Sequence, residues 1–334
     1  MMTDMELRRG RRVWVTHEQL ADEAVRMLND NDIDVLFSPP YTPPGELAEK
    51  LARWQVDGLI VRQGKITAPV IAASPKLRVI AKHGVGVDNV DLKAAAELGI
   101  PVVRATSSNA RAVAEMAISL SVALLKELPY LDASIKGGQW LKPTFVGRDM
   151  QGSVLGLVGF GSIGQETAQI ARALGFRIIA HDPHGRKAIQ SFDAAMERSL
   201  DELLAEADVV SLHCPLTHET RGMIGRAQFE KMKSRAILVN TARGGLVNET
   251  DLRVALQEGR IGGAGLDSFA QEPPAPDNPL WRAPNLIVTP HVAGVSHGST
   301  RTMATMAARQ VIDILDGKAP LPRNLVKLAE SVTA

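Results

Sequence analysis

The sequence predicts an α/β protein built from two parallel-sheet domains, one inserted into the other. Two observations support this prediction. Short apolar runs alternate with helix-like segments along most of the 334 residues, and such alternation is typical of parallel strands joined by crossover helices. A glycine-rich turn then opens a second series of these units in mid-chain. A chain of this length also suits two domains of ordinary size.

The first series of units precedes a long helix. It predicts strands at Val13–Val15, Val35–Phe37, Gly58–Val61, Val79–Ala81 and Val102–Val103, and helices at Glu18–Asn29, Gly45–Ala52, Ala68–Ala73 and Leu92–Leu98. Gly99-Ile100-Pro101 ends the last of these helices and begins the last strand. The small and apolar residues of Ala110–Lys126 then predict a long helix that is buried or lies in an interface.

The second series follows a long connection that contains Trp140. A last helical pattern, Thr300–Leu315, is too isolated to form a third domain, so we expect it to pack on the first series. Residues 1–106 and 298–334 would then form one domain, and residues 107–297 a second domain inserted into it. The predicted elements of the second series are strands at Val154–Val158, Phe176–Ala180, Val209–His213, Ala236–Asn240, Ala264–Asp267 and Leu286–Thr289, and helices that include Gly225–Met232 and Glu249–Glu258.

The glycine-rich turn has the spacing of a dinucleotide-binding motif. A predicted strand runs directly into Gly159-Phe160-Gly161-Ser162-Ile163-Gly164, and a helix follows. Gly159 permits a tight turn, Gly161 lets the backbone approach a pyrophosphate, and Gly164 lets the helix pack close to the sheet. Asp182 stands 18 residues after Gly164, where its carboxylate can accept both ribose hydroxyls of NAD. The alternative is an ordinary strand-to-helix turn.

The composition excludes several classes of partner. The net charge is +1, from 38 basic and 37 acidic side chains, so neither a nucleic-acid-binding surface nor a membrane-binding surface is expected. No apolar stretch is long enough to span a membrane. The single cysteine, Cys214, rules out an internal disulfide and fits the reducing cytoplasm. Its apolar surroundings beside Pro215 favour a packed thiol over a nucleophile.

Three further motifs follow predicted strands, at the sheet edge where open α/β sheets bind ligands. Arg243, in the run NTARGG, offers a planar set of donors that suits a carboxylate; the alternative is a solvent-facing loop arginine. Asp267 and Glu272, in the run GLDSFAQEPP, supply two carboxylates. His291, in the run TPHVAG, ends the last strand. An isolated histidine is usually structural, but this one shares its edge with an arginine and a carboxylate.

Together these motifs resemble the D-isomer-specific 2-hydroxyacid dehydrogenases, a family that includes D-3-phosphoglycerate dehydrogenases and glyoxylate/hydroxypyruvate reductases. The resemblance covers nearly the whole chain and extends to HGVGVDNVD at residues 83–91 and HCPLT at residues 213–217. It implies an NAD(P)-dependent oxidoreductase that acts on a CH–OH group. It also implies a Rossmann-type, doubly wound NAD-binding domain inserted into a smaller, flavodoxin-like substrate domain.

The resemblance assigns roles to individual residues. The catalytic residues would be Arg243, Glu272 and His291, and no metal site is expected. The substrate carboxylate would meet the backbone of Gly84, Val85 and Gly86 as well as Arg243. The dinucleotide would contact Gly159, Gly161, Ser162, Ile163, Gly164, Asp182, Cys214, Pro215, Thr217, Thr241, Ala242, His291 and the nicotinamide-binding Asp267.

The expected chemistry is the interconversion of a 2-hydroxy acid and its 2-oxo acid. His291 would give a proton to the carbonyl oxygen and take it back in reverse, because imidazole is both an acid and a base near neutral pH. Glu272 would orient the ring and favour its charged form, while Arg243 would hold the carboxylate and polarise the carbonyl. A closing cleft would exclude water. The rival hypothesis is a non-enzymatic NAD(H)-sensing corepressor, which binds NADH without consuming it.

Several details stay open in the sequence. Asp182 repels a 2′-phosphate and favours NAD, although Arg186 nearby can accommodate NADP. Arg62 and Lys82 either bind a second anion of the substrate or are ordinary charges, so the 2-hydroxy acid is not identified. The sequence ends without the regulatory extension of some phosphoglycerate dehydrogenases, and serine feedback by that route is not expected. The helix Ala110–Lys126 and its following loop predict a homodimer, in which Trp140 packs locally or reaches the partner.

Overall fold

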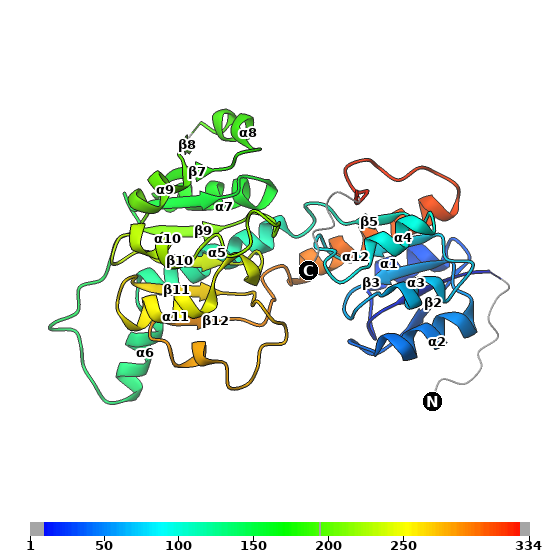
Figure 1. Cartoon of the computed structure of the whole chain (residues 1–334), viewed down its shortest axis with the longest axis horizontal. Helices are drawn as coiled ribbons and strands as arrows, with labels where there is room; N and C mark the ends of the chain where they lie inside the picture. Colours follow the sequence, from blue (N-terminus) through cyan, green and yellow to red (C-terminus); the bar gives the residue numbers. More distant parts are fainter. Residues whose placement is uncertain (1–9, 194, 328–334) are drawn as a thin grey trace. The chain divides into compact units, whose positions relative to one another are not determined.

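The computed structural model describes residues 10–193 and 195–327, which form two units (Figure 1). Of the described residues, 10–109 and 296–327 form unit 1, and 110–193 and 195–295 form unit 2. Each unit is built on a parallel β-sheet with helices on both faces, so the predicted α/β class is confirmed. Within the described ranges, no helix is long and apolar enough to cross a membrane.

Unit 1 contains a five-stranded sheet in the order β2-β1-β3-β4-β5, and all its strand pairs are parallel. This is the flavodoxin-like strand order. The central strands are apolar on both faces, as expected for a parallel sheet covered twice. The strands are β1 (Arg11–Val15), β2 (Ile33–Phe37), β3 (Gly58–Val61), β4 (Val79–Lys82) and β5 (Val102–Arg104).

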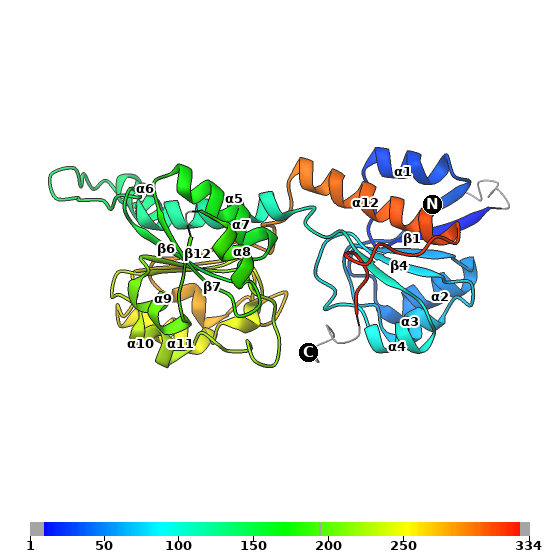
Figure 2. The same ribbon diagram turned by 90° about the horizontal axis from the view of Figure 1, so that it is seen from above.

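Helices from both ends of the chain cover the sheet of unit 1 (Figure 2). On one face lie α1 (Asp22–Asn29) and α12 (His297–Leu315), where Leu28 and Val311 pack against Val13. The final helix is therefore part of the same core as the first strand. The other face carries α2 (Pro44–Trp54), α3 (Ala68–Ala72) and α4 (Leu92–Glu97).

Unit 2 contains a seven-stranded parallel sheet in the order β12-β11-β10-β9-β6-β7-β8. Counted from β6, this is the Rossmann order 3-2-1-4-5-6 with one strand added. The winding reverses between β6 and β9, which is where such sheets bind their ligands. The strands are β6 (Val154–Val158), β7 (Arg177–His181), β8 (Ala195–Glu197), β9 (Val209–Leu212), β10 (Ile237–Asn240), β11 (Gly263–Leu266) and β12 (Leu286–Val288).

Two layers of helices enclose this second sheet. On one face, the long α5 and α7 contribute Leu120 and Ala168 to a core with Leu157. On the other, Leu203 and Leu252 pack with Val210. The helices of unit 2 are α5 (Ala110–Leu125), α6 (Leu128–Lys136), α7 (Ser162–Ala173), α8 (Arg186–Ser191), α9 (Leu200–Glu206), α10 (Arg226–Lys231) and α11 (Glu249–Gln257).

The predicted elements differ from the structure at a few places. The helix predicted to begin at Glu18 begins at Asp22 instead. The preceding residues form a turn in which the Gln19 N–H donates to His17 Nδ1 and the Gln19 carbonyl accepts from Arg62. The sequence analysis missed α6, α8, α9 and β8. β8 is a three-residue edge strand with no buried residue, so it has no apolar run to reveal it.

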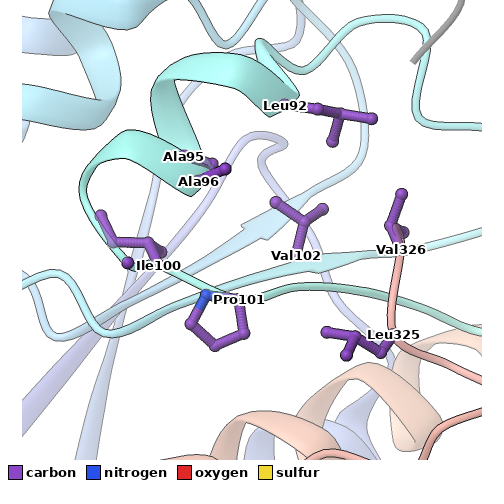
Figure 3. A pocket seen from close by; sticks show the side chains of 9 residues that line it. Leu92, Ala95, Ala96, Ile100, Pro101, Val102, Leu325 and Val326 are labelled. Carbon is purple, nitrogen blue, oxygen red and sulfur yellow. The ribbon is translucent and has the colours of Figure 1, made fainter. Parts of the chain in front are cut away.

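The last described residues pair with the edge strand β5. Leu325 forms an antiparallel bridge with Val103, and the Val326 N–H donates to the Val102 carbonyl at 2.9 Å. Between this segment and α4 lies an apolar cavity of about 250 Å³, whose wall includes Leu92, Ala95, Ile100, Val102, Leu325 and Val326 (Figure 3).

Candidate active site

The three predicted catalytic residues follow three neighbouring strands of unit 2. Arg243 comes after β10, Glu272 after β11 and His291 after β12, and β10, β11 and β12 lie side by side. The Nδ1 atom of His291 is 2.7 Å from Oε2 of Glu272, and both side chains are partly exposed, at 46% and 37%. Glu272 therefore holds the imidazole at Nδ1, and the other ring nitrogen, Nε2, takes no part in this pair.

Local contacts keep Glu272 ionised. Its Oε1 accepts the Phe269 N–H at 3.0 Å, so each carboxylate oxygen has a partner. Burial raises the pKa of Glu272. The hydrogen bonds from His291 and Phe269, together with the positive charges of His291 and Arg243, lower this pKa by more than burial raises it. The net pKa therefore lies below the ordinary value. Arg243 is thus near enough to act on the same carboxylate.

A buried asparagine shapes the turn that carries Arg243. Asn240 is completely buried; its Oδ1 accepts the Ala242 N–H at 3.1 Å and its Nδ2 donates to the Arg243 carbonyl at 2.8 Å. Gly244 packs directly on the backbone of Phe269, where any Cβ would collide with it. The turn of Arg243 and the loop of Glu272 are therefore held against each other.

Asp267 is bonded to the loop of His291. It is completely buried, and its Oδ1 accepts the Thr289 hydroxyl at 2.5 Å and the Val292 N–H at 2.9 Å. Its Oδ2 accepts the Ala293 N–H at 2.8 Å. Between these partners, His291 adopts the left-handed region at φ = 55°, which few residues other than glycine occupy.

The glycine-rich turn has the backbone form expected for dinucleotide binding. Gly159 turns off β6 at φ = 95°, and a Cβ there would lie 2.7 Å from the backbone of Cys214. A Cβ on Gly161 would meet no atom within 4 Å, so the space above this residue is open. The turn leads into α7, whose first N–H groups are free for an anion. These residues fit a pyrophosphate.

Asp182 reaches back to the same turn. Its Oδ2 accepts the Phe160 N–H at 2.8 Å, and its Oδ1 accepts the N–H groups of His184 and Gly185 at 2.9 and 2.8 Å. The carboxylate is therefore fixed beside the glycine turn, at the end of β7. This is the position in which a carboxylate meets ribose hydroxyls.

The remaining predicted cofactor residues lie in loops of the same unit. Thr217 closes a turn with Thr220, whose hydroxyl also donates to the carbonyl of Pro215. Burial raises the pKa of the Cys214 thiol to about 11, so this cysteine is not an activated nucleophile. Ala242 is partly buried, and the hydroxyl of Thr241, like that of Ser268, is buried without a hydrogen-bond partner among the described residues.

The predicted substrate-binding residues of unit 1 surround the end of β4. Lys82 Nζ donates to the Arg62 carbonyl at 3.2 Å and to Asn89 Oδ1 at 3.1 Å. Arg62 Nη1 donates to the Gln19 carbonyl at 2.7 Å, and burial lowers its pKa. Gly84, which is buried at φ = 136°, then leads to the partly exposed Val85 and Gly86.

Sequence reasoning missed three residues that hold this site together. Asn240 and Thr289 were part of quoted motifs but received no role, although an asparagine directly after a strand is a known turn signal. Glu249, at the start of α11, accepts the Ala270 N–H at 2.7 Å and so fastens the Glu272 loop. Nothing local in the sequence indicates that contact. In the described part of the chain, no cluster of side chains could hold a metal ion.

Comparison with known proteins places the site in context. Residues 118–293 match the family model described as D-isomer specific 2-hydroxyacid dehydrogenase, NAD binding domain. The D-3-phosphoglycerate dehydrogenase of Methanocaldococcus jannaschii is 42% identical over 93% of this chain. The glyoxylate reductase of Aeropyrum pernix is 35% identical over 96% of this chain and 98% of its own length.

These relatives differ in length. The chain spans 58% of the M. jannaschii protein and 58% of the D-3-phosphoglycerate dehydrogenase of Archaeoglobus fulgidus. Among solved structures, the TT0316 protein of Thermus thermophilus is 37% identical, with a TM-score of 0.85 over 95% of this chain and 100% of its own. Other similar structures hold different dinucleotides: an acyclic imino acid reductase holds NADPH, and a formate dehydrogenase from Staphylococcus aureus holds NAD.

Proposed function

Because this chain belongs to the D-isomer-specific 2-hydroxyacid dehydrogenase family, we propose that it interconverts a small 2-hydroxy acid and its 2-oxo acid with a nicotinamide dinucleotide. The observation that carries the proposal is the pair of His291 and Glu272, in which Nδ1 lies 2.7 Å from Oε2. The positive charge of Arg243 also lowers the pKa of this carboxylate. A proton donor, its orienting carboxylate and a carboxylate-binding arginine are what this reaction needs.

Each of these residues has a proposed part in the reaction. His291, held at Nδ1 by Glu272, presents Nε2 as the atom that gives the proton to the carbonyl oxygen of the 2-oxo acid or removes it from the 2-hydroxy acid. The ionised Glu272 stabilises the protonated ring. Arg243 binds the substrate carboxylate and offsets the charge that grows on the carbonyl oxygen. The bound dinucleotide supplies or accepts the hydride.

We infer that NAD(H) is the preferred dinucleotide. The carboxylate of Asp182 is fixed at the end of β7 by three backbone N–H groups, and a negative charge there repels the 2′-phosphate of NADP(H). The rest of the proposed dinucleotide site is the glycine turn Gly159–Gly164, with Cys214, Pro215, Thr217, Thr241, Ala242 and Asp267 in the surrounding loops. Equal kcat/KM with NADPH and NADH would overturn the preference.

The substrate proposal concerns the first unit. We propose that the backbone of Gly84, Val85 and Gly86 receives the substrate carboxylate. Lys82 Nζ donates to the backbone carbonyl of Arg62, and the positive charges of both residues act on His83, directly before this loop. A second anionic group on the substrate, such as a phosphate or sulfonate, would be recognised there. A phosphate or sulfonate substrate would therefore depend on Lys82 and Arg62 far more than a simple acid would.

The test is NADH consumption, followed by absorbance, with glyoxylate, pyruvate, hydroxypyruvate, phosphohydroxypyruvate and sulfopyruvate in turn. We expect the unaltered protein to turn over at least one of these acids and the variant His291→Ala to lose that turnover. A preference for a doubly anionic acid, removed in Arg62→Gln, would support the second-anion proposal, whereas a preference for glyoxylate or hydroxypyruvate would leave Arg62 structural. Tight NADH binding without turnover of any acid would overturn the proposed enzymatic activity and favour an NAD(H) sensor.

We also propose that the protein is a homodimer through α6 and the loop after it. Large apolar side chains are exposed there: Tyr130 is 49%, Ile135 57% and Trp140 70% exposed. Ile135 and Trp140 line one cavity with Leu131 and Phe145, so these apolar side chains form one patch. Exposed apolar patches of this kind mark interfaces. Ile135→Asp should give a monomer by sedimentation, and an unchanged dimer would exclude this face.

The compartment is a further proposal. Cys214 is a free thiol, which fits the reducing cytoplasm. Cell fractionation tests this directly, and recovery from an oxidising compartment would overturn it.

A further inference from the structure

The sheet of unit 1 reverses its winding between β1 and β3. In the order β2-β1-β3-β4-β5 the chain passes from β1 to β2 on one side and returns to β3 on the other, so the helices before and after this reversal cover opposite faces. Open α/β sheets bind ligands at such a point, outside the carboxyl ends of the strands. Here that place is flanked by His17, which follows β1, and Arg62, which follows β3.

Hydrogen bonds tie these two strand ends together. Thr16 is 3% exposed, and its hydroxyl accepts the N–H groups of Arg62 and Gln63 at 2.9 and 3.2 Å and donates to the Gln63 carbonyl at 2.8 Å. The Arg62 side chain adds two contacts. Its Nη1 donates to the Gln19 carbonyl at 2.7 Å and lies 3.3 Å from Nδ1 of His17. The loops after β1 and β3 are therefore fixed against each other.

The contacts of His17 decide which of its ring nitrogens carries the hydrogen. The Gln19 N–H donates to Nδ1 at 3.0 Å, and Nη1 of Arg62 approaches the same atom. Both partners are donors, so Nδ1 is the acceptor and the hydrogen of the neutral ring lies on Nε2. Burial and the positive charge of Arg62 lower the pKa of His17 by more than Gln19 and Glu18 raise it. The ring is therefore neutral near neutral pH, and Nε2 is a donor.

Three donor atoms of this pair have no partner among the described residues: Nε2 of His17, and Nε and Nη2 of Arg62. None of the three is closed off from solvent, in contrast to Nε2 of His83. Nε2 shares a ring with Nδ1, and Nη2 shares a guanidinium with Nη1, so the contact at 3.3 Å keeps all three within reach of one oxyanion. Arg62 is partly buried and pairs with no described carboxylate, which is unfavourable until an anion joins it.

The number of these donors indicates the shape of the anion. A carboxylate has two oxygens, and Nε and Nη2 of Arg62 can bind both without another group. A phosphate or sulfonate has a third terminal oxygen, which the Nε2–H of His17 suits. Lys82 differs from His17, because its Nζ already donates to the Arg62 carbonyl and to Asn89 Oδ1.

We infer that His17 is a specificity-determining residue of the substrate site and that, with Arg62, it binds the phosphate or sulfonate group of a doubly anionic 2-oxo acid. The inference rests on the proposed function, in which Gly84–Gly86, after the neighbouring strand β4, receive the substrate carboxylate. Arg62 binds two of the three terminal oxygens, and the Nε2–H of His17 donates to the third. A carboxylate in that position leaves His17 without a partner, so the pair distinguishes a tetrahedral anion from a planar one.

Binding in the presence of NAD⁺ tests this site without turnover, because a 2-oxo acid and NAD⁺ cannot react with each other. Calorimetry on the full chain gives the Kd for two matched pairs of acids. Phosphohydroxypyruvate is compared with hydroxypyruvate, which lacks the phosphate, and sulfopyruvate with oxaloacetate, in which a carboxylate replaces the sulfonate. In at least one pair the unaltered protein should bind the phosphate or sulfonate member about tenfold or more tightly.

Two variants of His17 separate its donor from its acceptor. His17→Asn keeps an oxygen near the position of Nδ1 but ends short of Nε2, so it should reduce the preference about tenfold. His17→Gln extends an amide nitrogen to the position of Nε2 and should restore most of the preference.

Lys76→Gln is the control for charge, since Lys76 is an exposed cation of unit 1 that precedes β4, at the opposite edge of the sheet; the preference should persist in it. Three results would each overturn the inference: equal binding of both members in each pair, an unchanged preference in His17→Asn, or a loss in His17→Asn that falls equally on both members. Failure of the proposed reaction would look different. NADH would not be consumed with any acid, while a preference that depends on His17 would still support the site.

Discussion

Asp267 fixes the chain on both sides of His291. Its carboxylate accepts the Thr289 hydroxyl before the histidine and the N–H groups of Val292 and Ala293 after it. His291 itself is held at φ = 55°, a region that costs a non-glycine residue free energy unless its surroundings enforce it. The buried carboxylate supplies that enforcement, so the direction of the imidazole depends on a residue behind the loop as well as on Glu272.

Thr289→Val tests this positioning role. The variant keeps the shape of the side chain and removes only the hydroxyl that donates to Asp267 at 2.5 Å. A hydrogen bond to a charged group contributes about 1.5–3 kcal/mol, so we expect kcat to fall about tenfold or more while the Kd for NADH stays near that of the unaltered protein. If Asp267 acted only on the nicotinamide amide, the Kd would rise instead and kcat at saturating NADH would be preserved.

His291→Ala should lower kcat by about 10²–10⁴-fold, the usual contribution of a positioned acid or base. Binding of NADH, measured by fluorescence, should survive, since the glycine turn is untouched. A kcat within a few-fold of that of the unaltered protein would remove His291 from the proposed reaction and require another proton donor.

Glu272→Gln should move the pH dependence of reduction. Because the pKa of Glu272 lies below its ordinary value, the carboxylate stays charged across the neutral range and loses its charge only as the pH falls through that lowered pKa. Its negative charge stabilises the protonated form of the neighbouring imidazole. Removing the charge should therefore shift the fall of kcat/KM with rising pH to a lower pH. An unshifted profile would show that the charge of Glu272 does not act on His291.

The two glycines of the turn after β6 should respond differently to alanine. Gly161→Ala adds a Cβ into open space, so stability should be unchanged while affinity for NADH falls, because a pyrophosphate needs that space. Gly159→Ala adds a Cβ 2.7 Å from the backbone of Cys214 at φ = 95°, so it should lower Tm as well. Full NADH affinity in Gly161→Ala would place the dinucleotide elsewhere.

The sequence predicted most of what positions this site, because the relevant signals are local. The glycine turn, Asp182, Arg243, Glu272 and His291 each follow an apolar run that indicates a strand, and parallel strands bring their ends to one edge. The structure does bring Arg243, Glu272 and His291 to neighbouring strands. Their roles in a reaction stay predictions.

The contacts that hold these residues were beyond the sequence, because they join segments far apart in the chain. Glu249 and Ala270 are separated by 21 residues and Asp267 and Ala293 by 26, and no spacing pattern links such pairs. The sequence also indicated a role for Asp267 at the nicotinamide, whereas its complete burial was visible only in the fold. Short elements such as β8 were missed because they bury nothing.

Acid should destabilise unit 2 through His213. Its Nε2 lies 3.0 Å from the Ser211 hydroxyl, and its Nδ1 has no partner among the described residues. Burial lowers the pKa of His213 from 6.5 to about 4. The folded state therefore holds fewer protons than the unfolded state between these values, so the stability is complete above about pH 6.5 and is lost as the pH falls toward about 4. A shift of this size corresponds to at most about 3 kcal/mol.

His213→Gln isolates this contribution. Glutamine keeps a donor and an acceptor near Ser211 but does not titrate, whereas His83, whose pKa is also lowered to about 4 by burial, remains in both proteins. The free energy of unfolding in urea should therefore fall less steeply in the variant between about pH 7 and about pH 5. The difference between the two proteins cancels the effect of His83, because that residue lies in unit 1 and titrates alike in both. Parallel pH dependences would mean that His213 is protonated without opening the core around it.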